Sequence, residues 1–176
     1  MKRPHGTSGE RGGALVELDI VLTVLLTLTF GIMDFSRALY AYHFVSHAAR
    51  EATRYASVRG STYSTACNPP TLASNCYATA SAITSYVQSL VSSGIYVNGN
   101  ATGPSTAGYL AVTTTWPGTA GSGITSTACS TSNGKTNNPG CAVQVEVQYT
   151  YGFSLPFLNK LTAMQISSTS EFVISQ

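Results

Sequence analysis

The feature that most constrains this chain is a long apolar run near its N-terminus. From Ala14 to Met33 the sequence has twenty residues that are apolar or small apart from Glu17, Asp19 and three threonines. In a helix that rises 1.5 Å per residue, such a run is about 30 Å long, which is the thickness of the hydrocarbon layer of a membrane. We therefore expect a helix that crosses a bilayer once, with its span at about residues 14–33.

Two other interpretations of this run are weaker. A buried core helix is one, but fourteen consecutive uncharged residues from Ile20 to Met33, preceded by a basic segment, would be unusual in a soluble protein. A cleaved secretory signal peptide is the other, because Ser36-Arg37-Ala38 resembles a small-x-small cleavage site. The acids at the start of the run and the helical pattern that continues past residue 38 argue against cleavage there.

Charge divides the chain into two parts. Twelve of the sixteen charged residues precede Gly60, and the 117 positions from there onward contain only four. Residues 1–12 are basic and glycine-rich, and we expect them to form a disordered cytoplasmic leader; residues 13–59 form the helix, and residues 60–176 an extracytoplasmic head. Basic residues before the span favour a cytoplasmic N-terminus, although arginines beyond it weaken this assignment.

All four cysteines lie in the charge-poor part of the chain, at Cys67, Cys76, Cys129 and Cys141. Four cysteines allow three pairings, and short loops close at a smaller entropic cost than long ones. We therefore expect disulfides between Cys67 and Cys76 and between Cys129 and Cys141, formed in an oxidising compartment outside the cytoplasm. A zinc site is less favoured because close C-x-x-C spacing is missing.

Beyond Gly31 the helix is predicted to continue as an amphipathic rod, which would be about 67 Å long from Ala14 to Val58 and would stop at Gly60. Its expected core stripe repeats at steps of three and four residues. The members of this stripe are Phe35, Leu39, Tyr42, Val45, Ala49, Ala52 and Ala56.

The head is predicted to contain one helix followed by strands. Ala78–Val91 has a helical apolar stripe. Tyr109–Trp116 and Ala142–Tyr151 alternate in the manner of strands, and Gln165–Ile174 does so more weakly. The predicted fold class is therefore α+β, with a long N-terminal helix, a second helix and a small antiparallel sheet. The segment Gly118–Gly140 is long for a loop and would be a variable or functional excursion.

The sequence gives little support for metal binding, catalysis or nucleic-acid binding. His43, His47 and Glu51 stand on one helix face at the spacing of metal ligands, but an ordinary polar face with intrahelical pairs explains them better. The head has no histidine and only two acids, so we expect neither an enzyme nor a cofactor. A net charge of +2 without a clustered basic face excludes a nucleic-acid footprint.

Several segments together resemble the TadE-like family of pseudopilins. They are the pair Gly12-Gly13, the acid Glu17, the run from Phe30 to Tyr40 (FGIMDFSRALY) and the run from Ala48 to Ala56 (AAREATRYA). The resemblance is strongest over residues 11–59, with a looser similarity at Val143–Tyr149 and Ser168–Phe172.

This resemblance implies a structural subunit of a Tad-type (type IVc) pilus or a related filament or secretion apparatus, with adhesion as a possible outcome. It implies a prepilin peptidase that cuts between Gly12 and Gly13 and makes Glu17 the fifth mature residue. There the carboxylate would meet the N-terminus of a neighbouring pilin or pseudopilin subunit in a homo- or hetero-oligomeric filament. The chain would lie in a bacterial inner membrane as a single-pass protein with a cytoplasmic N-terminus, or in an extracellular pilus.

Two residues depart from the family pattern. Leu18 replaces an aromatic residue, and Asp19 stands where the family has an apolar one. An acid at the edge of a membrane span is costly unless it is paired or lies among the headgroups. The alternative function is therefore a permanently anchored surface-binding protein that keeps its leader and does not assemble, in which both acids are merely interfacial.

Overall fold

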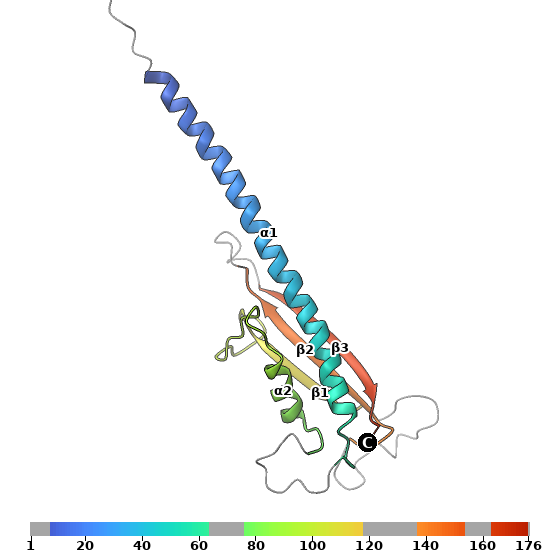
Figure 1. Ribbon diagram of the computed structural model, residues 1–176. Helices are drawn as coiled ribbons and strands as arrows, with labels where there is room; N and C mark the ends of the chain where they lie inside the picture. The colour runs from blue at the N-terminus through green and yellow to red at the C-terminus, as the bar shows by residue number, and fades with distance from the viewer. Residues whose placement is uncertain (1–7, 64–75, 118–136, 154–162, 176) are drawn as a thin grey trace, which may run out of the picture.

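A computed structural model describes residues 8–63, 76–117, 137–153 and 163–175, and the side chains from Gly12 onward. It consists of a long helix that projects from a compact α+β head (Figure 1). The predicted fold class is confirmed: the described elements are helix α1 (Ser8–Ser57), helix α2 (Ala80–Ser89) and strands β1 (Leu110–Thr115), β2 (Ala142–Tyr151) and β3 (Met164–Val173).

Helix α1 contains 50 residues, which corresponds to a length of about 75 Å. It begins at Ser8, so the expectation of a disordered segment is wrong for residues 8–12. The first helical turn is difficult to form and later turns add easily, so a helix established in the long apolar run extends back through Gly12 and Gly13. At the other end, the Ser57 hydroxyl donates to the Arg54 carbonyl over 3.0 Å, and regular helix ends three residues before Gly60.

The short helix α2 is capped at its N-terminus by Thr79. The Thr79 hydroxyl oxygen accepts a hydrogen bond from the backbone N–H of Ala82 over 3.2 Å, which satisfies one of the free donors of the first turn. Ile83 and Val87, one turn apart, are buried. The predicted helix over residues 78–91 is therefore confirmed in type, with ends two residues shorter on each side.

The three strands form one antiparallel sheet in the order β1-β2-β3. Val147 at the centre of β2 is opposite Val112 on one side and Ser168 on the other. Alternation places the odd-numbered residues of β2 on one face, where Val143 to Tyr151 are all buried. Both helices cover this face: α1 packs on β2 and β3, and α2 packs beside α1 on β1 (Figure 1).

A row of small residues brings α1 close to the sheet. The apolar residues of α1 that are almost fully buried in this contact are Ala41, Val45, Ala48, Ala49, Ala52 and Ala56. The predicted stripe is therefore right from Val45 onward and wrong before it, because Phe35, Leu39 and Tyr42 are about half exposed or more. In that part of the helix, the sheet faces Ala41 and Asp34 instead.

Candidate assembly surface

The N-terminal half of α1 is an exposed apolar rod. It is the only helix among the described residues that is long and apolar enough to cross a membrane, and none of its most apolar 18-residue window is buried. The large side chains from Leu15 to Met33 are 45–67% exposed. Such a surface is incompatible with water and requires lipid or the helices of other subunits around it. The helix thus fits membrane anchoring.

The hydroxyl groups on this rod do not oppose its burial in an apolar environment. Thr23, Thr27 and Thr29 each donate to the carbonyl oxygen four residues earlier, over 2.8 Å. A hydroxyl satisfied within its own helix needs no partner from water. The polar groups that remain on the rod are therefore the two acids near its beginning.

Glu17 and Asp19 are both exposed, and they point in different directions. Two residues correspond to about 200° around an α-helix, so the two carboxylates lie on nearly opposite sides. Among the residues whose side chains the structure describes, no basic group lies within ion-pair distance of either acid. One neighbouring positive charge could therefore pair with only one of the two acids.

Gly12 and Gly13 lie inside the first part of α1. A Cβ atom at either position would meet nothing within 4 Å, so neither glycine is required for packing within the chain. Each glycine lowers helix stability by about 1 kcal/mol relative to alanine. Two in succession therefore weaken the helix locally at this point.

Where the rod meets the head, Asp34 is only 6% exposed. The Tyr151 hydroxyl lies 3.0 Å from the Asp34 Oδ1 atom and 3.1 Å from its backbone carbonyl oxygen, and donates to this residue. Burial of the phenol, followed by its hydrogen bond to Asp34, raises the pKa of Tyr151 to about 12. Tyr151, the last residue of β2, therefore stays protonated. Its hydrogen bond connects the end of β2 to α1 at the edge of the apolar span.

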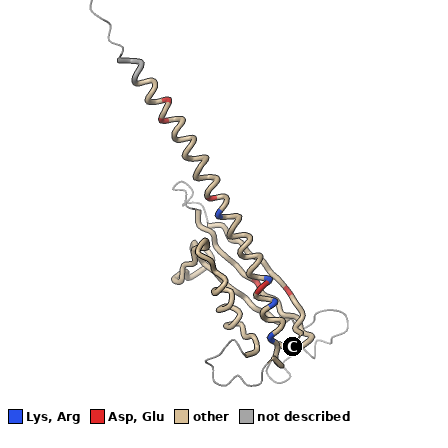
Figure 2. Tube along the Cα trace, in the orientation of Figure 1, with Lys and Arg blue, Asp and Glu red and all other residues tan. Residues whose placement is uncertain are grey.

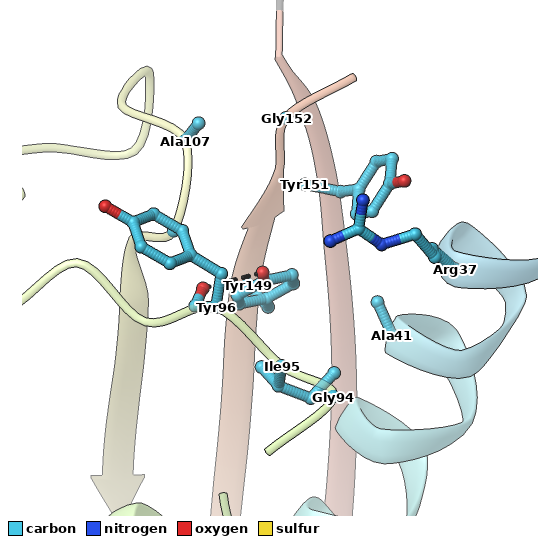
Figure 3. A pocket seen from close by; sticks show the side chains of 10 residues that line it. Arg37, Ala41, Gly94, Ile95, Tyr96, Ala107, Tyr149, Tyr151 and Gly152 are labelled. Atoms are coloured by element: carbon cyan, nitrogen blue, oxygen red, sulfur yellow. Dashed lines mark hydrogen bonds between the residues drawn. The ribbon is translucent and has the colours of Figure 1, made fainter. Parts of the chain in front are cut away.

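A small cavity of about 60 Å³ lies beside this contact. Figure 3 shows Arg37 extending from α1 toward Tyr149 and Tyr151 on β2. Tyr149 donates to the Tyr96 carbonyl oxygen over 2.8 Å, and burial raises the pKa of Tyr149 although the positive charge of Arg37 lowers it in part. The cavity is large enough only for water-sized molecules, so we interpret it as part of the junction between helix and head.

Asp34, Arg37 and Tyr151 have no role assigned from the sequence alone. The signal for Asp34 was present, because a single acid directly after an apolar run indicates either a functional site or a specific partner. The signal for Tyr151 was not, since nothing local distinguishes it from the other nine tyrosines.

The predicted disulfides fall partly outside the described residues. Cys76 and Cys141 are disulfide-bonded, and no described cysteine is free. Cys67 and Cys129 lie in segments that the structure does not describe, so the pairing stays a prediction.

The face of α1 that contains His43, His47 and Glu51 is a polar surface of the helix. His47 and Glu51 line a groove beside β3, and the His43 ring packs edge-on against Tyr42 at 5.9 Å. No group of three potential metal ligands occurs among the described residues. Glu51 instead pairs loosely with Arg54 over 3.7 Å.

Comparison with known proteins gave one match. The family model described as "TadE-like protein" matches residues 12–54, which contain Gly12, Gly13, Glu17, Asp34 and Arg37. The resemblance seen in the sequence is thereby confirmed over these residues. Neither the search of curated proteins nor the search of solved structures gave a match.

Proposed function

Because residues 12–54 match the TadE-like protein family, we propose that the chain is a pilin or pseudopilin subunit of a Tad-type (type IVc) pilus or a related surface filament or secretion apparatus. Its role in this proposal is structural and not enzymatic. It is inserted in the inner membrane with a cytoplasmic N-terminus, processed by a prepilin peptidase, and assembled with other pilin or pseudopilin subunits through α1. The head then lies outside the cytoplasm and contributes to adhesion.

The observation that carries this proposal is the exposed apolar half of α1, where none of the most apolar 18-residue window is buried. A helix that only anchors a protein needs lipid around it, whereas a subunit must exchange lipid for neighbouring helices at little energetic cost. Both environments are apolar, so the exchange depends on packing and on polar pairs. The rod offers the packing surface, and its acids offer the polar pairs.

Glu17 is the acid to which we assign the pairing in the filament. A cut between Gly12 and Gly13 makes it the fifth residue and creates a new N-terminal ammonium group. A carboxylate in an apolar filament core is costly unless it is paired with a positive charge. The N-terminal ammonium of a neighbouring subunit meets this need and fixes the axial offset between the two helices.

The test is to compare Glu17→Gln with Asp19→Asn in the intact apparatus. We expect Glu17→Gln to leave the protein in the membrane but to abolish its incorporation into sheared filaments or its co-purification with other subunits. Asp19→Asn removes one charge from the opposite side of the same helix, so it is the matched control and should assemble normally.

The mature N-terminus provides an independent measurement. Intact mass of the protein extracted from membranes should correspond to a chain that begins at Gly13. A chain that still begins at residue 1 or 2, together with normal behaviour of Glu17→Gln, would contradict the proposal. The permanently anchored surface-binding protein would then be the better account.

A further inference from the structure

The face of the sheet that points away from the helices carries an isolated acidic pair. Glu146 on β2 and Glu171 on β3 are the only charged side chains among the described residues from 60 to 175, and both are exposed. Glu146 is directly opposite Thr169, so Glu171 is its diagonal neighbour on the same face, at about 7–8 Å. We call Glu146 and Glu171 the acidic pair.

The surface around the acidic pair is polar and ordered. Thr115 donates to Gln144 over 3.2 Å, and Gln148 donates to Gln165 over 3.1 Å. These bonds join β1 to β2 and β2 to β3, so the acidic pair is surrounded by amides and hydroxyls that are held in place across the strands. Within the described part of the chain, no basic group is in ion-pair distance of either carboxylate. Two neighbouring negative charges repel each other, and a pair of cations would remove this repulsion.

A matching pair of cations lies on the other side of the molecule. Arg50 and Arg54 are exposed on α1, one turn apart, so their Cβ atoms are about 6 Å from each other. Figure 2 shows blue segments along this outer half of α1. Arg50 donates to the hydroxyl of Ser46 on its own helix over 3.0 Å. Arg54 pairs loosely with Glu51 of the same helix over 3.7 Å, and because its side chain is exposed, this contact exchanges readily for one with another carboxylate. We call Arg50 and Arg54 the basic pair.

The basic pair has an apolar border. Both arginines line a groove of about 640 Å³ between α1 and β3, together with Val58 and Phe172. Val58 is 46% exposed and Phe172 is 54% exposed. A partner that binds in the groove can therefore bury apolar area next to the charges. Exposed ion pairs alone contribute little to binding, and this buried area would add to them.

We propose that the acidic pair of one copy docks onto the basic pair of a second copy of this chain. The two pairs agree in number, are opposite in sign and have similar spacing. The acidic pair is on the sheet face that points away from α1, and in the described part of the chain it forms no ion pair with the basic pair of the same copy. Each copy keeps one pair that is not used in the first contact, so the contact is heterologous, and in a filament it repeats from copy to copy. The inference rests on the proposed function, because it supplies a head-to-head contact for that filament.

The experiment is a charge swap in the full-length chain, purified in detergent at low ionic strength. Glu146→Lys with Glu171→Lys, and separately Arg50→Glu with Arg54→Glu, should each weaken self-association about tenfold in sedimentation analysis, since two exposed ion pairs together contribute on the order of a factor of ten at low salt. All four substitutions in one chain should restore association, because the charges are opposite again. Raising the salt to about 1 M, where the Debye length is about 3 Å, should weaken association of the unaltered chain.

Two controls separate this contact from general effects of charge. Ser85→Lys with Gln88→Lys introduces two lysines, as the Glu146→Lys with Glu171→Lys variant does, but on the exposed side of α2, and it should leave association unchanged. Circular dichroism should show that every variant is folded, as expected for exposed positions. Weakened association in the α2 control, or failure of the fourfold variant to recover, would overturn the proposal.

A crosslink identifies the partner directly. Arg50→Lys with Arg54→Lys keeps both charges and introduces amines, which a zero-length carbodiimide can join to carboxylates. Mass spectrometry should find position 50 or 54 joined to Glu146 or Glu171 in a dimer band. Joining of these positions only to carboxylates of other proteins in membranes would overturn the self-contact. Neither measurement uses Glu17 or the mature N-terminus. Loss of the contact between heads would therefore leave the tests of the proposed function unaffected, and failure of those tests would not alter the result of the charge swap.

Discussion

Tyr151 in β2 donates its phenolic hydrogen to Asp34 in α1, a residue 117 positions earlier in the chain, with 3.0 Å between the Tyr151 hydroxyl oxygen and Asp34 Oδ1. Asp34 lies immediately after the predicted membrane span, so this hydrogen bond holds the end of the sheet to the helix where it leaves the apolar layer. The head is thereby fixed on the outer half of α1 and leaves the inner half free.

We expect Tyr151→Phe to destabilise the head by about 1–3 kcal/mol, because it removes a hydrogen bond from a buried acid. Urea unfolding in detergent, followed by near-ultraviolet circular dichroism, measures this change. Tyr96→Phe is the matched control, since the Tyr96 side chain is 65% exposed and its loss of a hydroxyl should have little effect. Equal stability of the two variants would show that the contact with Asp34 contributes nothing.

Stability should also fall at high pH because of the same residue. The pKa of Tyr151 is raised to about 12, first by burial and then by the hydrogen bond to Asp34, whereas the ordinary pKa of tyrosine is 10.0. The contribution of this residue is complete below pH 10 and is lost as the pH rises to about 12, because the unfolded chain releases the proton first. The ultraviolet absorbance of tyrosinate should show a last transition in the folded protein that Tyr151→Phe removes.

Gly108 is predicted to tolerate no side chain. Its φ angle is +80°, and a Cβ atom there would lie 2.9 Å from the backbone nitrogen of Asn98 and from the Tyr96 ring. Both of its backbone groups are also bonded, to Thr150 and Asn98. Gly108→Ala should destabilise the head by more than about 1 kcal/mol. Thermal unfolding of the purified variants measures this loss of stability. Gly99→Ala is the control and should have little effect, because nothing lies within 4 Å of its added carbon.

The disulfide pairing of Cys67 with Cys76 and of Cys129 with Cys141 remains a prediction. Peptide mapping without reduction should yield one crosslinked peptide from each region. A disulfide stabilises a fold by restricting the unfolded chain, and for loops as short as these each bond should contribute about 3 kcal/mol. A peptide that joins the region of Cys67 to that of Cys129 or Cys141 would contradict the pairing.

The sequence alone determined the features that depend on neighbours in the chain. The apolar run, the strand Ala142–Tyr151 with its final bounds, and the helix predicted over residues 78–91 all follow from local periodicity, because the period of apolar residues reflects which side of one element is buried. The family resemblance is local in the same sense, since it rests on a continuous segment of α1. These features were sufficient for the fold class and for the candidate residues Gly12, Gly13 and Glu17.

Only the tertiary structure decided which surfaces meet. Phe35, Leu39 and Tyr42 have the correct spacing for a core stripe, yet the sheet lies against Asp34 and Ala41, because the direction of the strands sets which side of α1 they face. The same holds for the contact of Asp34 with Tyr151 and for the position of Glu146 beside Glu171, which depends on the pairing register of β2 and β3. Contacts between distant segments depend on the packing of whole elements, and a repeat along one segment contains no information about its partner.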